Sequence, residues 1–370
     1  MNKMQILLVV RPATGGIRTH IKAMVTYLAA EFDFTIACPS ERMADYHALP
    51  CHVRGVPLTG CIDPVADLRT MRELAQIVQA GSFQMIHAHG FKAAFVARPV
   101  ARFCKIPCLV TLHSDFAQAQ SSRLPEFYVV MERILARWTT EYITVSQWLA
   151  KKLVRSLQIS EKHISVIPNG IEMTAKHVAT PVMLPFAGDL LVVGTVARLV
   201  SQKGLDVFLH ATALLAPRFP HVRFVVAGEG PLRSSLEQLR ETLGLTERVI
   251  FLGYCEHVAA LLATLSVFVM PSVSEAQGIA VLEAMVAGCP VVVSATGGLS
   301  ELVQDNYNGL LVAPSDDKSL AKAIEALLVQ PQLAARLAKQ AQLDVTRFSQ
   351  RKSMGDTKRI YQRVLEGGPL

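Results

Sequence analysis

The sequence has no run of eighteen apolar residues without a charge, and its first apolar stretch, QILLVV, stops at Arg11 and Pro12. A membrane-spanning helix needs about 20 mainly apolar residues, and a signal peptide needs a cleavage site after its apolar core, so neither is predicted. The 7 cysteines are scattered, and none belongs to a CxxC pair or to a Cys/His group with metal-ligand spacing. We therefore predict a cytoplasmic protein with reduced thiols and no metal site.

The motifs of several common classes of protein are also missing. There is no GxGxxG fingerprint for a nicotinamide dinucleotide and no GxxxxGK[ST] loop, and no Ser/His/Asp arrangement or nucleophile elbow stands out. The basic clusters carry no interleaved aromatic residues and belong to no known binding module, which argues against a nucleic-acid partner.

Alternation of apolar runs with helical periods is what the chain does contain. Its 370 residues, 51% hydrophobic and 18% charged, are typical of a globular protein with two domains. Strands that are apolar on both faces and alternate with helices, such as residues 63–80 and 90–103, predict parallel sheets covered by helices. The expected strands are QILLVV, FTIACP, QMIHAH, CLVTLH, YITVS and ISVIP, then LLVVGTVA, RFVVAG, VIFLG, VFVMP, PVVVS and GLLVAP.

The alternation is interrupted over residues 172–189, which contain two prolines and no clean period. We interpret this stretch as a linker between a domain over residues 1–180 and another over residues 181–347. The predicted fold class is α/β, with two Rossmann-like, doubly wound parallel sheets. Ligands of such sheets bind at the carboxyl ends of the strands, so we expect the chemistry in the loops there, facing a shared cleft.

Two glutamates, Glu275 and Glu283, stand in the segment SEAQGIAVLEAMVAGCPVV. A fully helical segment would separate them by roughly 12 Å, more than the roughly 5–9.5 Å between the carboxylates of a glycosidase. We instead predict a helix that starts near Gly278, so that the backbone of Gly278, Ile279 and Ala280 forms an anion site beside Glu275. Glu283 is then placed to hold a diol such as ribose. The alternative is an ordinary helix surface.

A second candidate loop is GTVARLVSQKG, in which Arg198 follows a strand and Lys203 precedes a helix. Cations are unfavourable at a helix N-terminus unless an anion is bound there, so a pyrophosphate would account for both residues. The alternative is two exposed basic residues.

The first half offers weaker signals. In PATGGIRTH, Gly15 and Gly16 lie between a strand and a helix, where a backbone without Cβ lets a phosphate or sugar approach closely. His113 ends one apolar run, and His87 and His89 end another on one face of a strand. A histidine with a near-neutral pKa suits a hydrogen bond to a leaving phosphate or a sugar hydroxyl, although a structural role is an alternative.

Charge is distributed unevenly. Residues 1–170 carry 19 Lys and Arg against 12 Asp and Glu, a net of +7, whereas residues 171–370 carry 18 of each. An excess on one side fits an anionic surface or substrate, or a simple surplus for solubility. Two basic clusters are candidates: Lys92, Arg98, Arg102 and Lys105 on one helix face, and Lys151, Lys152 and Arg155 on another.

Ten segments in order resemble the family 4 retaining glycosyltransferases, which have the GT-B fold. The most specific is MPSVSEAQGIAVLEAMVAGCPVVVSATGGLSELV, where two glutamates separated by seven residues precede a buried strand. The others are GGIRTH, HAHG, TLHS, TVSQWL, IPNGIE, VARLVSQKG, GEGPLR, FLG and NGLLVAP. The resemblance covers essentially the whole chain, and residues 348–370 look like the helix that crosses back to the first domain.

The resemblance implies a role for each matching residue. Glu275 would bind the hydroxyls of the donor sugar, Glu283 would hold the ribose, and Arg198 and Lys203 would neutralise the diphosphate. The other donor contacts would come from Gly15 and Gly16 and from the helix start at Gly278, Ile279 and Ala280. His113 would lie beside the anomeric carbon, with His20 and His89 on the acceptor side. The family uses no DxD metal site and no cofactor, and no DxD occurs here.

Two positions depart from the family pattern. Gln277 stands where an aromatic residue is usual, and Ser300 replaces the proline of the GG-x-P-E turn. Neither removes a charge that the mechanism needs. We therefore predict a retaining, metal-independent glycosyltransferase that moves a sugar from a nucleotide-diphosphate sugar to a saccharide or lipid-linked acceptor, in cell-envelope or exopolysaccharide synthesis.

The resemblance also bears on location. Family members often act on lipid-linked acceptors at the cytoplasmic face of the membrane, and the basic first half fits a peripheral position on an anionic surface there. The alternatives to a transferase are a nucleotide-sugar epimerase of the same fold, which would need no acceptor, and a catalytically silent binding scaffold.

Overall fold

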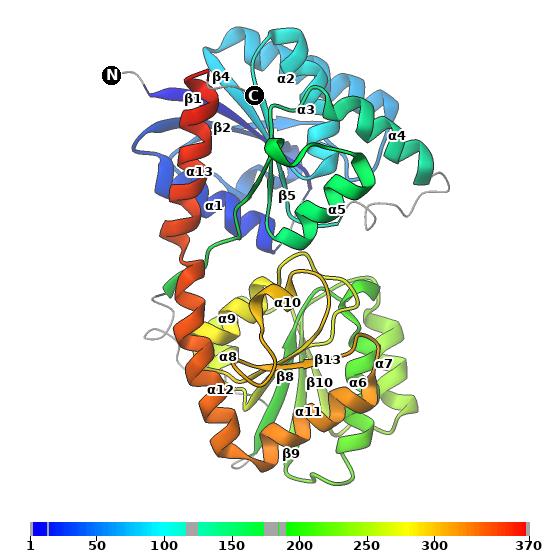
Figure 1. The fold of residues 1–370 in the computed structure, drawn as a ribbon. Helices are drawn as coiled ribbons and strands as arrows, with labels where there is room; N and C mark the ends of the chain where they lie inside the picture. The colour runs from blue at the N-terminus through cyan, green and yellow to red at the C-terminus, as the bar shows by residue number, and fades with distance from the viewer. Residues whose placement is uncertain (1–2, 13–14, 116–124, 174–183, 185–189, 368–370) are drawn as a thin grey trace. The chain divides into compact units, whose positions relative to one another are not determined.

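The computed structural model describes residues 3–12, 15–115, 125–173, 184 and 190–367. They form two compact units, shown in Figure 1. Unit 1 comprises Met1–Gly170 and Gln350–Leu370, and unit 2 comprises Ile171–Ser349. Most of the predicted linker over residues 172–189, including the expected boundary at 180/181, lies outside the described residues.

Unit 1 is built on a seven-stranded parallel sheet in the order β3-β2-β1-β4-β5-β6-β7. The strands are β1 (Met4–Val10), β2 (Phe32–Pro39), β3 (His52–Val56), β4 (Phe83–His89), β5 (Cys108–Leu112), β6 (Glu141–Thr144) and β7 (Ile164–Val166). The helices are α1 (Gly16–Leu28), α2 (Pro64–Ala80), α3 (Phe91–Cys104), α4 (Pro125–Ala136), α5 (Gln147–Leu157) and α13 (Gln350–Leu365). The chain order reverses between β1 and β4, and this switch point is where doubly wound sheets bind ligands.

Unit 2 repeats the scheme with six parallel strands in the order β10-β9-β8-β11-β12-β13. The strands are β8 (Leu191–Val196), β9 (Val222–Ala227), β10 (Val249–Gly253), β11 (Val267–Met270), β12 (Val291–Ser294) and β13 (Leu310–Val312). The helices are α6 (Leu205–Leu215), α7 (Arg233–Thr242), α8 (Val258–Thr264), α9 (Ile279–Ala287), α10 (Leu299–Leu302), α11 (Asp317–Val329) and α12 (Pro331–Asp344). The predicted α/β fold with two parallel sheets is confirmed.

Apolar runs form these strands because helices cover both faces of each sheet. In β1, residues 6–9 are 0% exposed whichever face they point to. The one strand of unit 1 that the sequence did not indicate, β3, lies at the edge of the sheet, and its first four residues alternate between exposed and half-buried. Such an edge strand lacks the continuous apolar run on which the prediction depended.

The last helix, α13, belongs to unit 1 and packs against α1. Tyr361 of α13 is fully buried, stacks edge-on against Phe32, and its hydroxyl hydrogen-bonds Nδ1 of His87 at 2.6 Å. Among the residues that the structure describes, no helix combines the length and the apolar character needed to cross a bilayer.

The predicted basic face of α3 is partly wrong. Lys92 is buried in an ion pair with Asp67 of α2, and Arg98 is 0% exposed and donates to Glu132 of α4 at 2.8 Å. Helical spacing shows which residues share a face, but here that face is covered by α2 and α4. Only Arg102 and Lys105 of this cluster are exposed.

Candidate active site

In unit 2, the loops after β8, β11 and β12 converge on Glu275. The ammonium group of Lys203, from the loop after β8, forms an ion pair with the Glu275 carboxylate, and both side chains are largely buried. In the same loop, the carbonyl oxygen of Gln202 accepts hydrogen bonds from Val273 N at 2.9 Å and from Ser274 N at 3.3 Å. Parallel strands bring these carboxyl ends to one edge of the sheet, so residues far apart in the sequence meet there.

Glycines make this convergence possible. Gly204 has φ +59, and a Cβ there would lie 2.2 Å from the carbonyl oxygen of Pro271. Gly297 has φ +54, and its Cβ would lie 2.0 Å from the carbonyl oxygen of Glu275, which accepts a hydrogen bond from Gly298 N at 2.9 Å. Any side chain at either glycine would separate the loops, so the glycines fix the backbone of Glu275.

Helix α9 begins at Ile279, as predicted, with Gly278 as its N-cap at φ +99. The cap makes no side-chain hydrogen bond in the described structure, and the first turn contains no acidic residue. The positive end of the helix therefore lacks the acidic or capping side chain that commonly neutralises it. This helix end lies three residues after Glu275 in the sequence. This arrangement suits an anion bound next to Lys203.

Glu283 lies on α9, just over one turn inside the helix. Burial raises the pKa of its carboxyl group to about 7. Glu283 also interacts electrostatically with Cys255 in the loop after β10. Burial raises the pKa of the Cys255 thiol, and the negative charge of Glu283 raises it further. The carboxyl group of Glu283 therefore keeps its proton to a higher pH than an exposed glutamate does, and a bound diol that donates hydrogen bonds would stabilise its charged form.

Arg198 is exposed in the loop after β8. The backbone of this loop is held by the segment after β9, because Leu199 N donates to the carbonyl of Glu229 at 2.9 Å. A Cβ on Gly228, whose φ is +133, would lie 1.9 Å from the carbonyl oxygen of Ala197. Sequence reasoning gave the segment GEGPLR no role of its own. Its glycine allows the close packing that positions the Arg198 loop.

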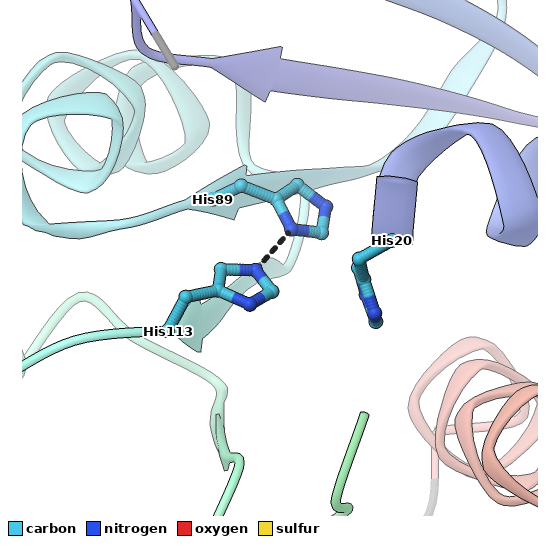
Figure 2. A group of neighbouring side chains, drawn as sticks. All are labelled: His20, His89 and His113. Carbon is cyan, nitrogen blue, oxygen red and sulfur yellow. Dashed lines mark hydrogen bonds between the residues drawn. The ribbon is translucent and has the colours of Figure 1, made fainter. Parts of the chain in front are cut away.

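In unit 1, three histidines meet at the switch point of the sheet (Figure 2). His20 comes from α1, His89 ends β4 and His113 follows β5. Nδ1 of His89 and Nε2 of His113 are 3.2 Å apart, and the ring centroid of His20 is 4.8 Å from that of His113 and 5.7 Å from that of His89. One nitrogen from each ring lies within 4.8 Å of the other two.

His87, on the same face of β4 as His89, is different because both of its nitrogens are occupied. Nδ1 hydrogen-bonds Tyr361 Oη at 2.6 Å and Nε2 hydrogen-bonds Thr111 Oγ1 at 2.7 Å. By contrast, Nε2 of His89 has no hydrogen-bond partner among the described residues, and the side chain near His20 and His113 that raises the pKa of both rings by hydrogen bonding is that of Asn169. His87 is therefore structural, whereas the other three rings have nitrogens left to bind a ligand.

Burial sets the charge of these rings. It lowers the pKa of His20 to about 4, an effect that the neighbouring Asn169 side chain partly offsets, and it lowers the pKa of His89 and His113 well below the usual value. The near-neutral pKa expected for His113 is therefore wrong, because burial and the neighbouring His20 and Arg11 all disfavour the charged form of the ring. At pH 7 His113 is a neutral imidazole, able to donate or accept a hydrogen bond but carrying no charge.

Gly15 and Gly16 precede the histidines at the start of α1. Gly15 is the N-cap with φ +66, and a Cβ placed there would meet no described atom within 4 Å. Glycine is therefore required at this position by the backbone conformation and not by a crowded neighbour. A phosphate or sugar that contacts the helix start closely, as predicted, requires such open space beside Gly15.

Two families of glycosyltransferases match the two halves of this chain. Residues 182–344 match Glycosyl transferases group 1, and residues 14–175 match Glycosyltransferase Family 4. The 2-deoxystreptamine glucosyltransferase of Streptomyces kanamyceticus is 30% identical over 298 residues, which cover 76% of this chain and 77% of that enzyme. An Escherichia coli enzyme named UDP-Gal:alpha-D-GlcNAc-diphosphoundecaprenol alpha-1,3-galactosyltransferase is 27% identical over 307 residues. The match covers 80% of this chain and 79% of the E. coli enzyme.

Solved structures agree on the fold. Anabaena HepE in complex with UDP and glucose superposes with a TM-score of 0.83 at 22% sequence identity, covering 97% of this chain and 99% of HepE. At 22% sequence identity, this structural similarity shows that the two proteins share the same arrangement of helices and strands.

Proposed function

The chain belongs to the group 1, family 4 glycosyltransferases, and from this premise we propose that it moves a sugar from a nucleoside diphosphate sugar to a saccharide or lipid-linked acceptor with retention at the anomeric carbon. The observation that carries the proposal is the pairing of Lys203 with Glu275 beside the uncapped start of α9. A cation, a carboxylate and free backbone N–H groups are what a sugar diphosphate requires.

In this proposal the residues of unit 2 hold the donor. Arg198, Lys203 and the backbone of Gly278–Ala280 bind the diphosphate. Glu275, released from Lys203 when the phosphate arrives, accepts hydrogen bonds from the sugar hydroxyls. Glu283 accepts hydrogen bonds from the ribose diol. The complexes of HepE with UDP and glucose support a uridine nucleotide as the first donor to test.

The proposed transfer takes place on one face of the sugar. The bond between the anomeric carbon and the leaving phosphate oxygen breaks while the acceptor oxygen bonds to the same carbon from the same side. The acceptor proton passes to that phosphate oxygen. Arg198 and Lys203 stabilise the negative charge that develops on the diphosphate, so the step requires neither a protein nucleophile nor a metal ion.

For unit 1 we propose that His113 acts as a neutral hydrogen-bond partner of the reacting sugar, with Gly15 and Gly16 at the donor phosphate and with His20 and His89 at the acceptor. One of the relatives above is named for a GlcNAc linked to diphosphoundecaprenol and another for 2-deoxystreptamine. These names support acceptors that range from a lipid-linked sugar to a small saccharide-like molecule. A role in cell-envelope or exopolysaccharide synthesis is the biological context we propose.

The first test is a thermal-shift panel of UDP, GDP, ADP and their sugars, with and without magnesium. A ligand at a hundred times its dissociation constant stabilises by about 2.7 kcal/mol, a shift of a few degrees for units of this size. We expect one base to stabilise the protein equally with and without magnesium. No shift with any nucleotide would favour a silent scaffold, and conversion of the free donor without acceptor would favour an epimerase.

We also propose that unit 1 associates with anionic membranes through α4 and α5. Val130 and Ile134 of α4 are 50% and 46% exposed one turn apart, and Trp138, in the turn that follows the helix, is 38% exposed. Arg133 ties α4 to α5 by donating to the carbonyl of Ser156 at 3.0 Å. An exposed apolar stripe beside basic residues is the pattern of a peripheral membrane surface.

Reversing Lys151 and Arg155 of α5 to glutamate tests this surface. Both side chains are exposed, whereas Lys152 is left intact because it pairs with Asp115. Each basic residue contributes about 1 kcal/mol at an anionic surface, so we expect at least an approximately 30-fold loss of binding to vesicles rich in anionic lipid. Cosedimentation measures this loss. The matched control reverses the exposed Lys322 and Lys339 of unit 2, and equal losses in both variants would contradict a specific surface.

A further inference from the structure

The side-chain cluster of His20, His89 and His113 has a composition that the transfer reaction does not require. The proposed function gives His113 a hydrogen bond to the reacting sugar and places His20 and His89 at the acceptor, and none of these roles requires three ring nitrogens so close together. Here three imidazoles gather without a carboxylate among the groups that could bind a metal with them, and one nitrogen from each lies within 4.8 Å of the others. Imidazole nitrogens are preferred ligands of zinc, copper and nickel, whereas magnesium and calcium prefer oxygen.

We propose that His20, His89 and His113 form a binding site for a divalent transition-metal ion of the zinc class. The site lies within unit 1, at the carboxyl ends of β4 and β5. It contains no atom of unit 2. Three protein ligands leave a fourth position open on a tetrahedral ion, for water or for an oxygen of a substrate.

The distances fit such an ion after a small adjustment. Tetrahedral coordination with Zn–N bonds of about 2.0–2.1 Å places ligand nitrogens about 3.4 Å apart. Nδ1 of His89 and Nε2 of His113 are already 3.2 Å apart. The separations within the cluster are at most 4.8 Å, so the longest must shorten by up to roughly 1.4 Å for all three rings to hold one ion.

The hydrogen bonds of the cluster are compatible with the same ion. His89 and His113 now share one proton between Nδ1 and Nε2. For both atoms to bind a metal, that proton must move to the outer nitrogen of the donor ring, which is Nε2 of His89 or Nδ1 of His113. Nε2 of His89 makes no hydrogen bond within the described part of the chain, so a proton on that atom breaks no other contact.

His87 serves as an internal comparison. It is the fourth imidazole of the group, and its ring centroid is only 4.1 Å from that of His89. Both of its nitrogens are committed to Tyr361 and Thr111, so it has no lone pair to offer without losing a buried hydrogen bond. The structure therefore assigns three of the four rings to the ion and the fourth to the core.

The test is a calorimetric titration of the full chain, stripped with chelator, with Zn²⁺ and with Mg²⁺. We expect one Zn²⁺ per chain and no Mg²⁺ at this site. Changing an outer-shell group of a metal site costs about 10–100-fold in affinity, so the loss of a ligand in His20→Ala or His89→Ala should cost at least as much. The titration uses no nucleotide, so its result is independent of the proposed transfer.

Two control variants exclude binding elsewhere. His47→Ala removes an exposed histidine and Cys61→Ser removes an exposed free thiol, and both should bind Zn²⁺ like the parent. Circular dichroism and the unfolding temperature without metal show whether each histidine variant folds, and the rise in that temperature with Zn²⁺ should be confined to proteins with all three rings. Zn²⁺ binding that survives in folded His20→Ala and His89→Ala, or a Co²⁺ spectrum with thiolate ligands, would overturn the site.

One consequence rests on the proposed function. Because the ion would occupy the imidazole that acts on the sugar, Zn²⁺ should inhibit transfer over the concentration range in which it binds. Binding without inhibition would leave the metal site intact and refute the role of His113. Inhibition that persists in His20→Ala after binding is lost would place the inhibitory ion elsewhere.

Discussion

Replacing Lys203 with alanine is expected to lower the rate of sugar transfer by about 10²–10³-fold, the usual cost of removing one group that stabilises charge in a transition state. Lys203 is the cation nearest to Glu275, and Gly204 holds its loop against the carbonyl of Pro271. The variant would leave the developing diphosphate charge to Arg198 and to the start of α9. Initial rates with donor and acceptor, together with calorimetric binding of the nucleoside diphosphate, measure the effect.

Two control variants sharpen this test. Lys203→Arg keeps the charge in a different shape and should recover part of the rate, because a guanidinium also binds phosphate. Lys339→Ala removes an exposed lysine of α12 and should change nothing. If Lys203→Ala transfers sugar at the parental rate, the diphosphate is not bound where we propose.

Glu275→Gln separates the two partners of the ion pair. In the unliganded protein Glu275 neutralises Lys203, so its charge is expected to matter for the sugar and not for the bare nucleoside diphosphate. We therefore expect this variant to transfer slowly and to bind UDP at least as tightly as the parent, since Lys203 no longer has a competing carboxylate. Parallel losses of transfer and of UDP binding would show that this division of roles is wrong.

The convergence of the strand-end loops in unit 2 was accessible from sequence for a physical reason. Continuous apolar runs identify buried parallel strands, and parallel strands place their carboxyl ends at one edge. The start of α9 at Ile279 follows from a glycine next to a segment of helix-forming residues. What the sequence could not provide was the contact of Lys203 with Glu275, because the two belong to loops 72 residues apart.

In unit 1, two features of the structure could not be predicted from the sequence. Helical spacing placed Lys92 and Arg98 on one face, but spacing carries no information on whether α2 and α4 cover that face. The absence of metal-ligand spacing had the same weakness. His20, His89 and His113 come from three separate elements, so no local pattern could reveal that they meet.

Glu283→Gln is expected to stabilise the unliganded protein above pH 7 and to leave its stability unchanged near pH 4.5. In the folded protein burial raises the pKa of Glu283 from 4.5 to about 7, so between these values the folded state holds a proton that the unfolded state has released. Stability therefore falls as the pH rises through this window, and the penalty is complete above about pH 7. A shift of this size corresponds to as much as about 3 kcal/mol.

Urea unfolding of both proteins between pH 5 and pH 8 measures this difference, with the exposed Glu247→Gln as a control that should show none. The same substitution should weaken nucleotide binding most at pH 8, because glutamine replaces the charged acceptor of the ribose diol. In the parent, nucleotide affinity should decline as the pH falls through about 7, since protonation removes one acceptor from the same carboxyl group. A buried carboxylate that destabilises the empty protein and strengthens the complex is the signature of a binding residue. Stability curves that stay parallel across the whole range would show instead that Glu283 is an ordinary solvated side chain.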